Sequence, residues 1–74
     1  MEKEMTFGEK AVGVSFNPSS MPEVDNVKKQ FAQMIDLMEE IQMKDRLGAM
    51  LKTEAQLSCV RASMSIVKLL TLKI

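Results

Sequence analysis

The sequence predicts an all-α fold, in which a short N-terminal helix is followed by a long antiparallel helical hairpin that assembles as a homo-oligomer. Two stretches have the S/T-x-x-E pattern of a capping box, which marks the first turn of a helix. Two long segments further along the chain, about residues 21–43 and 46–72, place apolar residues three and four positions apart, the period of an amphipathic helix. With 74 residues there is room for one domain, 1–74, and a lone chain of this length rarely buries enough apolar surface to be comfortably stable. We therefore expect several copies to complete one another.

The short helix is predicted over about residues 7–12. Thr6 and Glu9 form the capping box that opens it, and Gly13 with Val14 is expected to end it, because glycine readily leaves the helical conformation. A loop is expected to follow.

The first long helix is predicted over about residues 21–43. A second capping box, Ser20 with Glu23, opens it, and Pro22 is tolerated in the first turn, where its missing N–H is not needed. We expect its end near residues 43–45, although Glu39 and Glu40 oppose the helix dipole there. Its predicted packing seam, widened on one side by Ile35 and Leu37, consists of Val24, Val27, Phe31, Met34, Met38 and Ile41.

The second long helix is predicted over about residues 46–72, with Asp45 as its N-cap and Gly48 in its first turn. It carries two apolar stripes, and one antiparallel partner cannot cover both. The main seam reads Met50, Leu57, Val60, Met64 and Val67. The second stripe, with small residues that let backbones approach, reads Cys59, Ala62, Ser63, Ile66, Leu70 and Ile74. We expect the second stripe to form the oligomer interface.

Composition excludes several classes of function. The chain has one cysteine and no histidine, so neither an internal disulfide nor a His/Cys metal site can form, and no metal or cofactor is expected. Cys59 itself reads as a packing residue of a protein in a reducing cytosol. Ten basic and ten acidic side chains cancel, which argues against a DNA- or RNA-binding protein. The apolar runs are too short for a signal or a membrane span, which favours a cytoplasmic location.

Residues 6–20 (TFGEKAVGVSFNPSS) have the composition of a small anion-binding site. Asn17, Pro18 and Ser19 lie just before a long helix whose first N–H groups are unpaired and carry the positive end of its dipole. Lys28 or Lys29, early in that helix, can reach a phosphate held there. Surface charge is the alternative for at least one of these two lysines.

Three further candidates are less specific. Arg61 lies two turns after Glu54, and its guanidinium suits a phosphate, although a solvated face or a salt bridge to another copy explains the pair equally well. Phe7 and Phe16 read as core residues or as platforms for a nucleobase, whereas Phe31 reads as core. Lys10 is a candidate anion contact on the short helix.

The run GEKAVG-x-x-F-NPS, followed by PEVDNVKKQFAQMIDLMEE and TEAQ, resembles the small phage sponge proteins that counter cyclic-oligonucleotide-based anti-phage signalling (CBASS), relatives of the Thoeris-inhibiting sponges. The similarity covers about residues 7–67. The resemblance implies a hexamer that sequesters cyclic nucleotide messengers without cleaving them. It implies one pocket between paired protomers for cyclic dinucleotides of the cGAMP type, and another near three-fold axes for cyclic trinucleotides.

The resemblance also implies ligand-binding roles for particular residues. Phe16 and Asn17 match a pocket motif, Lys28 or Lys29 matches a phosphate contact, and Arg61 matches an arginine of the last helix. The family's Trp-Ala-Val-Lys segment after TEAQ is replaced here by Arg-Ala-Ser-Met at residues 61–64, which concerns the trinucleotide pocket most. The full set of predicted ligand-binding residues is Phe7, Gly8, Lys10, Phe16, Asn17, Pro18, Ser19, Lys28, Lys29 and Arg61.

The predicted function is stoichiometric capture of these messengers in the host cytoplasm during phage infection, which withholds them from immune effectors. The sequence lacks histidine and any recognisable activated nucleophile, so we do not expect an enzyme. A helical-bundle module that binds a host helix without any nucleotide is the alternative, and an enzyme that degrades the same messengers is a further competitor.

Overall fold

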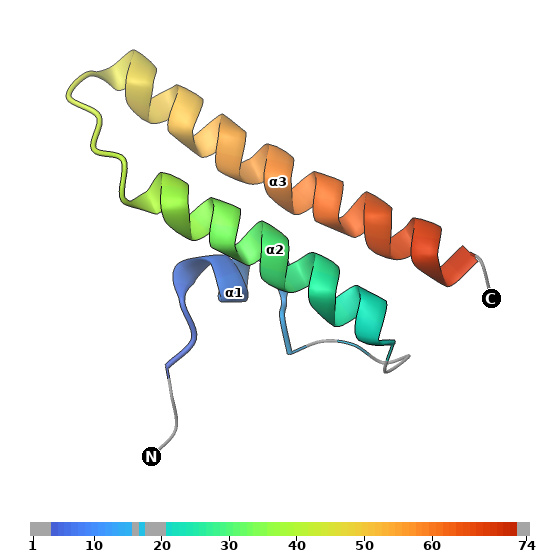
Figure 1. Cartoon of the computed structure of the whole chain (residues 1–74). Helices are drawn as coiled ribbons and strands as arrows, with labels where there is room; N and C mark the ends of the chain where they lie inside the picture. The colour runs from blue at the N-terminus through green and yellow to red at the C-terminus, as the bar shows by residue number, and fades with distance from the viewer. Residues whose placement is uncertain (1–3, 16, 18–20, 73–74) are drawn as a thin grey trace.

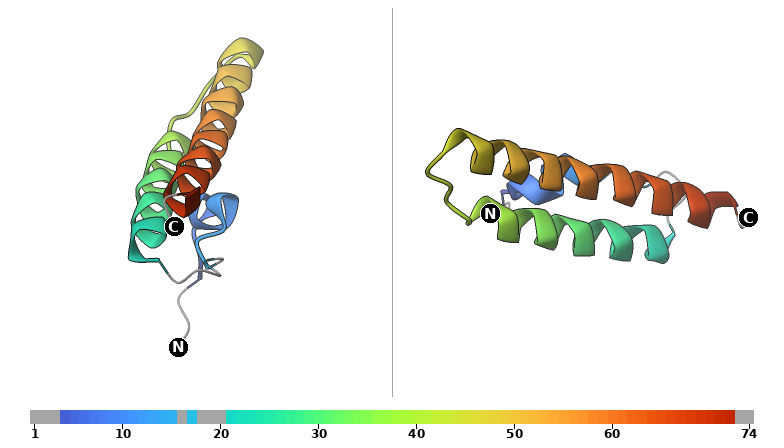
Figure 2. Two further views of the ribbon diagram at one scale, coloured as in Figure 1. Left: turned by 90° about the vertical axis from the view of Figure 1, so that its right-hand side faces the viewer. Right: turned by 90° about the horizontal axis from the view of Figure 1, so that it is seen from above.

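The computed structural model describes residues 4–15, 17 and 21–72, and this part of the chain is all-helical. It contains α1 (Phe7–Val12), α2 (Pro22–Glu39) and α3 (Arg46–Leu72). Helices α2 and α3 run side by side in opposite directions and form a hairpin (Figure 1). The two further views place α1 against one side of this hairpin, close to α2 (Figure 2). The predicted helical character and the hairpin are therefore observed.

Helix α1 has the predicted bounds and the predicted caps. The backbone N–H of Thr6 donates to Glu9 Oε1 at 2.8 Å, and the N–H of Glu9 donates to Thr6 Oγ1 at 3.1 Å, which completes the capping box. Gly13 ends the helix in the left-handed conformation with φ of 66°, which glycine adopts without steric cost. Local sequence alone explains this element.

The contact between α1 and α2 depends on Gly8. This residue is buried, and its N–H donates to Asp36 Oδ1 at 2.7 Å. A Cβ atom at this position would collide with the carbonyl oxygen of Ala32. The missing side chain therefore lets the backbone of α1 lie directly on α2, and Gly8 has a packing role.

The start of α2 differs from the prediction. The helix begins at Pro22, so Met21 is its N-cap, and the Met21 side chain makes no capping hydrogen bond. The predicted N-cap position is therefore wrong by one residue, and the predicted Ser20–Glu23 capping box falls on Ser20, which lies outside the described residues. Asn17 organises this turn instead: its Nδ2 donates to the Met21 carbonyl at 2.9 Å, and its Oδ1 accepts from the Met21 N–H at 3.4 Å. The Asn17 side chain thus stabilises the start of α2, the role that was expected of Ser20.

The end of α2 also differs, because the helix stops at Glu39 and not near residue 43. Lys52 of α3 explains the early end: its Nζ donates to the carbonyl oxygens of Glu39 at 3.1 Å and Ile41 at 2.9 Å. The N–H of Ile41 closes a tighter turn onto the Met38 carbonyl at 3.0 Å. A cation from the facing helix therefore meets the negative end of α2, which the acidic residues there could not stabilise.

Helix α3 starts as predicted, since Asp45 Oδ1 accepts the Gly48 N–H at 2.7 Å. The assignment of its two apolar stripes, however, is correct only in part. In the predicted main seam, Met50, Leu57 and Met64 are exposed, whereas Val60 and Val67 are half-buried. The second stripe, which was expected to face another copy, is buried or half-buried within the chain at Cys59, Ala62, Ser63, Ile66 and Leu70, and its last member, Ile74, lies outside the described residues.

The face of α3 that meets α2 also carries two polar side chains. Gln56 Nε2 donates to the Ile35 carbonyl at 3.3 Å and to Glu39 Oε1 at 2.9 Å, and Lys52 caps α2 as described. Small residues such as Ser63 allow close approach, and these polar groups then reach the backbone of α2. Apolar periodicity does not register such polar contacts, so the predicted main seam missed the face of α3 that meets α2.

The apolar core lies on α2. Among the described residues the buried hydrophobic side chains are Val24, Ala32 and Ile35. Phe31 is half-buried, and Met34 and Ile41 of the predicted seam are exposed, so that seam is shifted toward Ile35. Within the described part of the chain, no helix combines the length and apolar character that spanning a bilayer requires.

Candidate functional site

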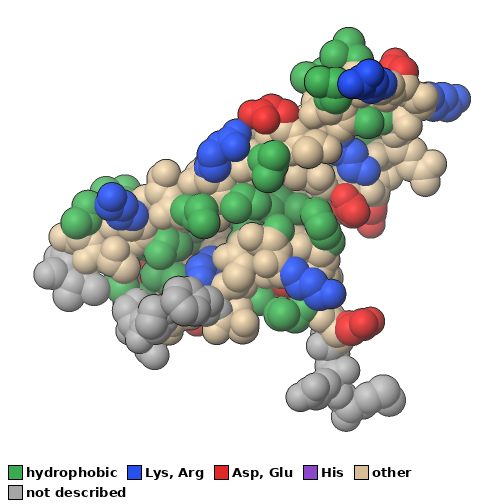
Figure 3. All heavy atoms as spheres, turned by 180° about the vertical axis from the view of Figure 1, so that it is seen from behind, with side chains coloured by type: hydrophobic (Ala, Val, Ile, Leu, Met, Phe, Trp, Pro, Cys, Tyr) green, Lys and Arg blue, Asp and Glu red, His purple; other side chains and the backbone are tan. Residues whose placement is uncertain are grey.

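A hollow of about 440 Å³ lies where the end of α1, the middle of α2 and the second half of α3 approach one another. Its walls are mainly apolar, and its polar groups come from two lysines, a serine and the backbone of the turn after α1. The space-filling view from the side that carries α1 shows hydrophobic side chains exposed along much of this face (Figure 3). The lining residues are Lys10, Ala11, Val12, Gly13, Lys28, Ser63, Met64 and Val67.

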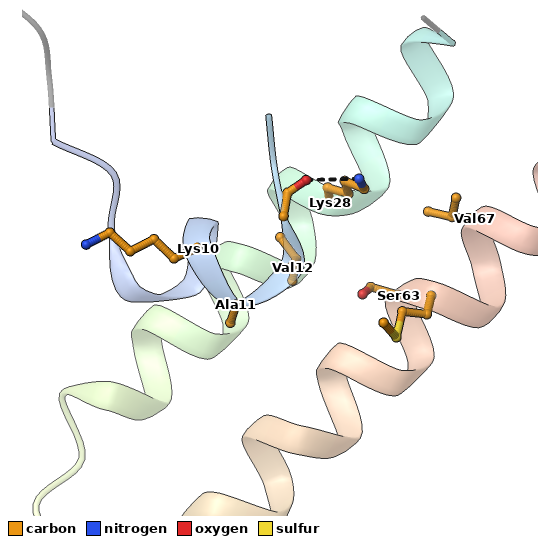
Figure 4. Close-up of a pocket in the computed structure, with 8 residues that line it drawn as sticks. Lys10, Ala11, Val12, Lys28, Ser63 and Val67 are labelled. Carbon is orange, nitrogen blue, oxygen red and sulfur yellow. Dashed lines mark hydrogen bonds between the residues drawn. The ribbon is translucent and has the colours of Figure 1, made fainter. Parts of the chain in front are cut away.

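Lys28 supplies the charged group of this hollow. The residue is only 7% exposed, and its Nζ donates to the Gly13 carbonyl at 2.9 Å (Figure 4). A cation at the C-terminal end of α1 is favourable, because the last carbonyl groups of a helix carry the negative end of its dipole. The fold therefore fixes the ammonium group in place at the edge of the hollow.

Ser63 forms part of the opposite wall. It is 2% exposed, and its Oγ donates to the Val60 carbonyl at 2.7 Å. Figure 4 shows its side chain and that of Val67 on the side of α3 that faces α1 and Lys28. A small residue here leaves room that a larger side chain would fill, so Ser63 shapes the hollow.

The other predicted site residue in this hollow, Lys10, contributes less than expected. Its side chain lines the cavity, but Figure 4 shows its ammonium group pointing away from Ser63 and Val67. Lys28 is thus the cation that the fold directs toward the α3 wall.

Asn17 has a structural role beside this site. Its Nδ2 donates to Asp25 Oδ1 at 3.0 Å as well as to the Met21 carbonyl, so the side chain links the loop to the first turn of α2. Three other predicted ligand residues of this loop, Phe16, Pro18 and Ser19, lie outside the described residues.

The remaining predicted residues lie elsewhere. Phe7 is 52% exposed and borders a separate hollow of about 110 Å³ with Ile35 and Leu57. Lys29 lies on another side of α2, where it lines a polar depression with Glu9 and Asp36. Neither side chain shares the hollow of Lys28, so the structure distinguishes the two lysines that the sequence could not.

Arg61 is exposed on α3, and its Nη2 lies 2.9 Å from Glu54 Oε1. It does not line the hollow. The predicted proximity of Glu54 and Arg61 is confirmed, and within one copy the guanidinium is directed to a carboxylate.

Sequence reasoning missed the wall that α3 provides. Ser63 and Val67 are four residues apart and so share a helix face, a spacing that was visible in the sequence. Val67 was assigned to the main seam and Ser63 to the oligomer interface, since nothing in the local pattern shows that the end of α1 lies opposite them. Only the docking of α1 on α2 brings these segments together.

The arrangement suits binding of an anion joined to a flat or apolar group. The fixed ammonium of Lys28 can meet a phosphate, and the apolar walls can cover a base or sugar. Among the described residues, no group of three or more His, Cys, Asp or Glu side chains is placed to hold a metal ion.

Comparisons of this chain with family models, with curated proteins and with solved structures found no match. The resemblance to phage sponges therefore depends on the sequence motifs quoted for it. The geometry of the hollow adds an argument from physical chemistry that does not depend on that resemblance.

Proposed function

We propose that this protein is a non-catalytic phage sponge that captures cyclic dinucleotides, and in a second kind of pocket cyclic trinucleotides, within a homo-oligomer in the host cytoplasm. The observation that carries the proposal is the hollow between α1 and α3, with its apolar walls and its buried Lys28 ammonium at the edge. A phosphate that enters there meets a charge whose position is already fixed, so little ordering is needed on binding. The expected outcome is capture without turnover.

A cyclic dinucleotide has two phosphates and two bases, whereas in the described part of one chain this hollow has the single buried ammonium of Lys28. A two-fold axis next to the hollow would double both, since it places the same residues of a second copy opposite the first. Because the ligand has two phosphates and two bases and the axis provides two copies of the hollow, a site shared between two copies is favoured. Contributions of Lys29 and Arg61 to such a shared site remain predictions.

The proposal is tested by nucleotide depletion. The purified protein is incubated with a cyclic dinucleotide of the cGAMP type, the free nucleotide is measured, and the protein is then digested with protease. A sponge lowers the free nucleotide in proportion to protein and returns it intact. Recovery of altered nucleotide would show an enzyme, and no depletion of either a cyclic dinucleotide or a cyclic trinucleotide would end the proposal.

A pair of matched variants tests the hollow itself. Val67→Phe extends a lining residue into the cavity, and we expect it to weaken capture at least tenfold. Leu37→Phe introduces the same aromatic side chain at an exposed position of α2 that does not line the hollow, and we expect capture to be unchanged. Equal capture by both variants would place the ligand elsewhere, provided that circular dichroism shows both to be folded.

A protein-interaction module is the second candidate, favoured by the many large apolar side chains that one copy leaves exposed. Its surface would bind a host helix and would need no nucleotide. This candidate predicts that neither nucleotide is depleted and that Val67→Phe leaves the interaction with the host protein intact. The depletion experiment therefore separates the two functions.

A further inference from the structure

The side of α3 turned away from α2 (Figure 1) carries a long apolar surface around one pair of opposite charges. The apolar side chains on it are between 47% and 73% exposed. At 1.5 Å per residue, they are spread over a helix about 40 Å long. We call this surface the outer face of α3; its apolar members are Leu47, Met50, Leu51, Leu57, Met64, Leu69 and Leu72.

We propose that the outer face of α3 binds the same face of a second copy in an antiparallel, two-fold arrangement, in which Glu54 of each copy pairs with Arg61 of the other. This inference names the contact on which the homo-oligomer of the proposed function is built, and it also stands if no nucleotide binds. It assigns Arg61 to assembly.

The positions of the two charges carry the argument. The midpoint between Glu54 and Arg61 along α3 lies between Leu57 and Ser58. At about 100° per residue, this midpoint faces the same direction as the two charged side chains. A two-fold axis through this point brings Arg61 of a second copy opposite Glu54, and Glu54 of that copy opposite Arg61. Each of the two charged side chains then has one opposite charge in its own chain and another in the second copy.

Other arrangements of the same two faces are less favourable. A parallel pair of helices places Glu54 opposite Glu54 and Arg61 opposite Arg61. A shift of the antiparallel register by seven residues brings either the two glutamates or the two arginines together. Like charges in a desolvated contact oppose association, so this charge pair selects one direction and one register.

Apolar contacts accompany the charges in that register. Met50 of one copy lies beside Met64 of the other, on the same side of the axis where the two Leu57 side chains meet. Met50 lies opposite the small Ser65, which leaves room for the longer side chain. The contact thus has an apolar centre with charge pairs on both sides of it.

The exposed area agrees with a stable contact. One chain of 8.3 kDa exposes 5903 Å², whereas a folded monomer of this mass is expected to expose about 4,600 Å². The excess of about 1,300 Å² is larger than the roughly 800 Å² that each partner contributes to a standard interface. A second copy of this chain therefore fits the outer face of α3, because the charges of this face are complementary to those of the same face on another copy.

Charge reversal followed by mixing tests the exchange between copies. Glu54→Arg and Arg61→Glu each place like charges opposite one another in a homodimer, and we expect at least a tenfold weaker association in sedimentation measurements without nucleotide. The double variant E54R/R61E restores it. An equimolar mixture of the two single variants also restores it, because each then offers the charges that the other lacks.

Mixing distinguishes this proposal from a Glu54–Arg61 ion pair that acts only within one chain. Positions 54 and 61 of each single variant still carry like charges after mixing, so an effect confined to one chain would not be reversed. Glu40→Arg and Lys44→Glu make the same changes in charge outside α3 and should associate as the unaltered protein does. The proposal is wrong if the unaltered protein is monomeric at tens of micromolar, if the single variants associate normally, or if their mixture stays dissociated. Circular dichroism of each variant confirms that weaker association is not unfolding.

Discussion

Lys28 and Lys29 are neighbours in the sequence, and the fold gives them opposite environments. Lys28 is buried and donates to the Gly13 carbonyl, so it ties α2 to the end of α1. Lys29 is exposed on another side of α2. A step of one residue turns a helix by about 100°, which is enough to move a side chain from a helix contact to solvent.

We predict that Lys28→Met lowers the free energy of unfolding by about 1–3 kcal/mol, because the half-buried Gly13 carbonyl loses a charged donor. Lys29→Met, the matched control, should change it by less than about 0.5 kcal/mol, as surface substitutions usually do. Urea denaturation measures both values. Equal losses in the two variants would show that the hydrogen bond to Gly13 does not hold α1.

At the scale of the helices, the early end of α2 depends on a residue of α3. Lys52 donates to two carbonyl groups at the end of α2, and its Nζ lies 4.0 Å from Glu39 Oε1. Helix ends leave carbonyl groups without partners inside the helix, so a donor from the facing helix can decide where the helix stops. Polar contacts therefore hold α2 and α3 together at this end of the hairpin.

Removal of this donor should loosen the end of α2 and leave the rest folded. In Lys52→Met we expect the amides of the last turn, residues 37–41, to exchange hydrogen at least five times faster, since about 1 kcal/mol of local stability is lost. Lys68→Met, on the outer face of α3, is the control and should not affect these amides. Unchanged exchange in Lys52→Met would mean that the backbone turn alone ends the helix.

At the scale of the whole molecule, one copy is thin and open. Its extents are 45 × 34 × 13 Å, and its radius of gyration is 13.7 Å, whereas a compact chain of this length has about 11 Å. Such a shape leaves few positions from which water is excluded, which explains why its buried apolar side chains, within the described residues, all belong to α2. A chain of this shape gains stability when copies cover one another.

Stability should consequently depend on protein concentration. A hundredfold increase in concentration should raise the midpoint of thermal unfolding by at least 5 °C, since association stabilises the folded state by up to about 2.7 kcal/mol over that range. Glu54→Arg should show a smaller shift, because it weakens the proposed contact. A midpoint that stays constant for the unaltered protein would identify a monomer that is stable by itself.

The sequence by itself determined the local features of this protein. The Thr6 capping box, the end of α1 at Gly13 and the Asp45 cap each depend on residues within a few positions, and all three were predicted correctly. The proximity of Glu54 and Arg61 was equally accessible, because seven residues always make about two turns of a helix. Such features need no knowledge of what lies across the fold.

The tertiary structure decided which faces meet and where the hollow lies. Cys59, Ser63 and Ile66 turned inward although Met50, Leu57 and Met64 are the larger side chains, because small residues and the reach of Gln56 and Lys52 favour the closer approach. The same docking separated Lys28 from Lys29 and placed Val67 opposite the end of α1. Hydrophobic periodicity records how apolar a helix face is, whereas packing depends on shape and hydrogen-bond partners from distant segments, which no local pattern contains.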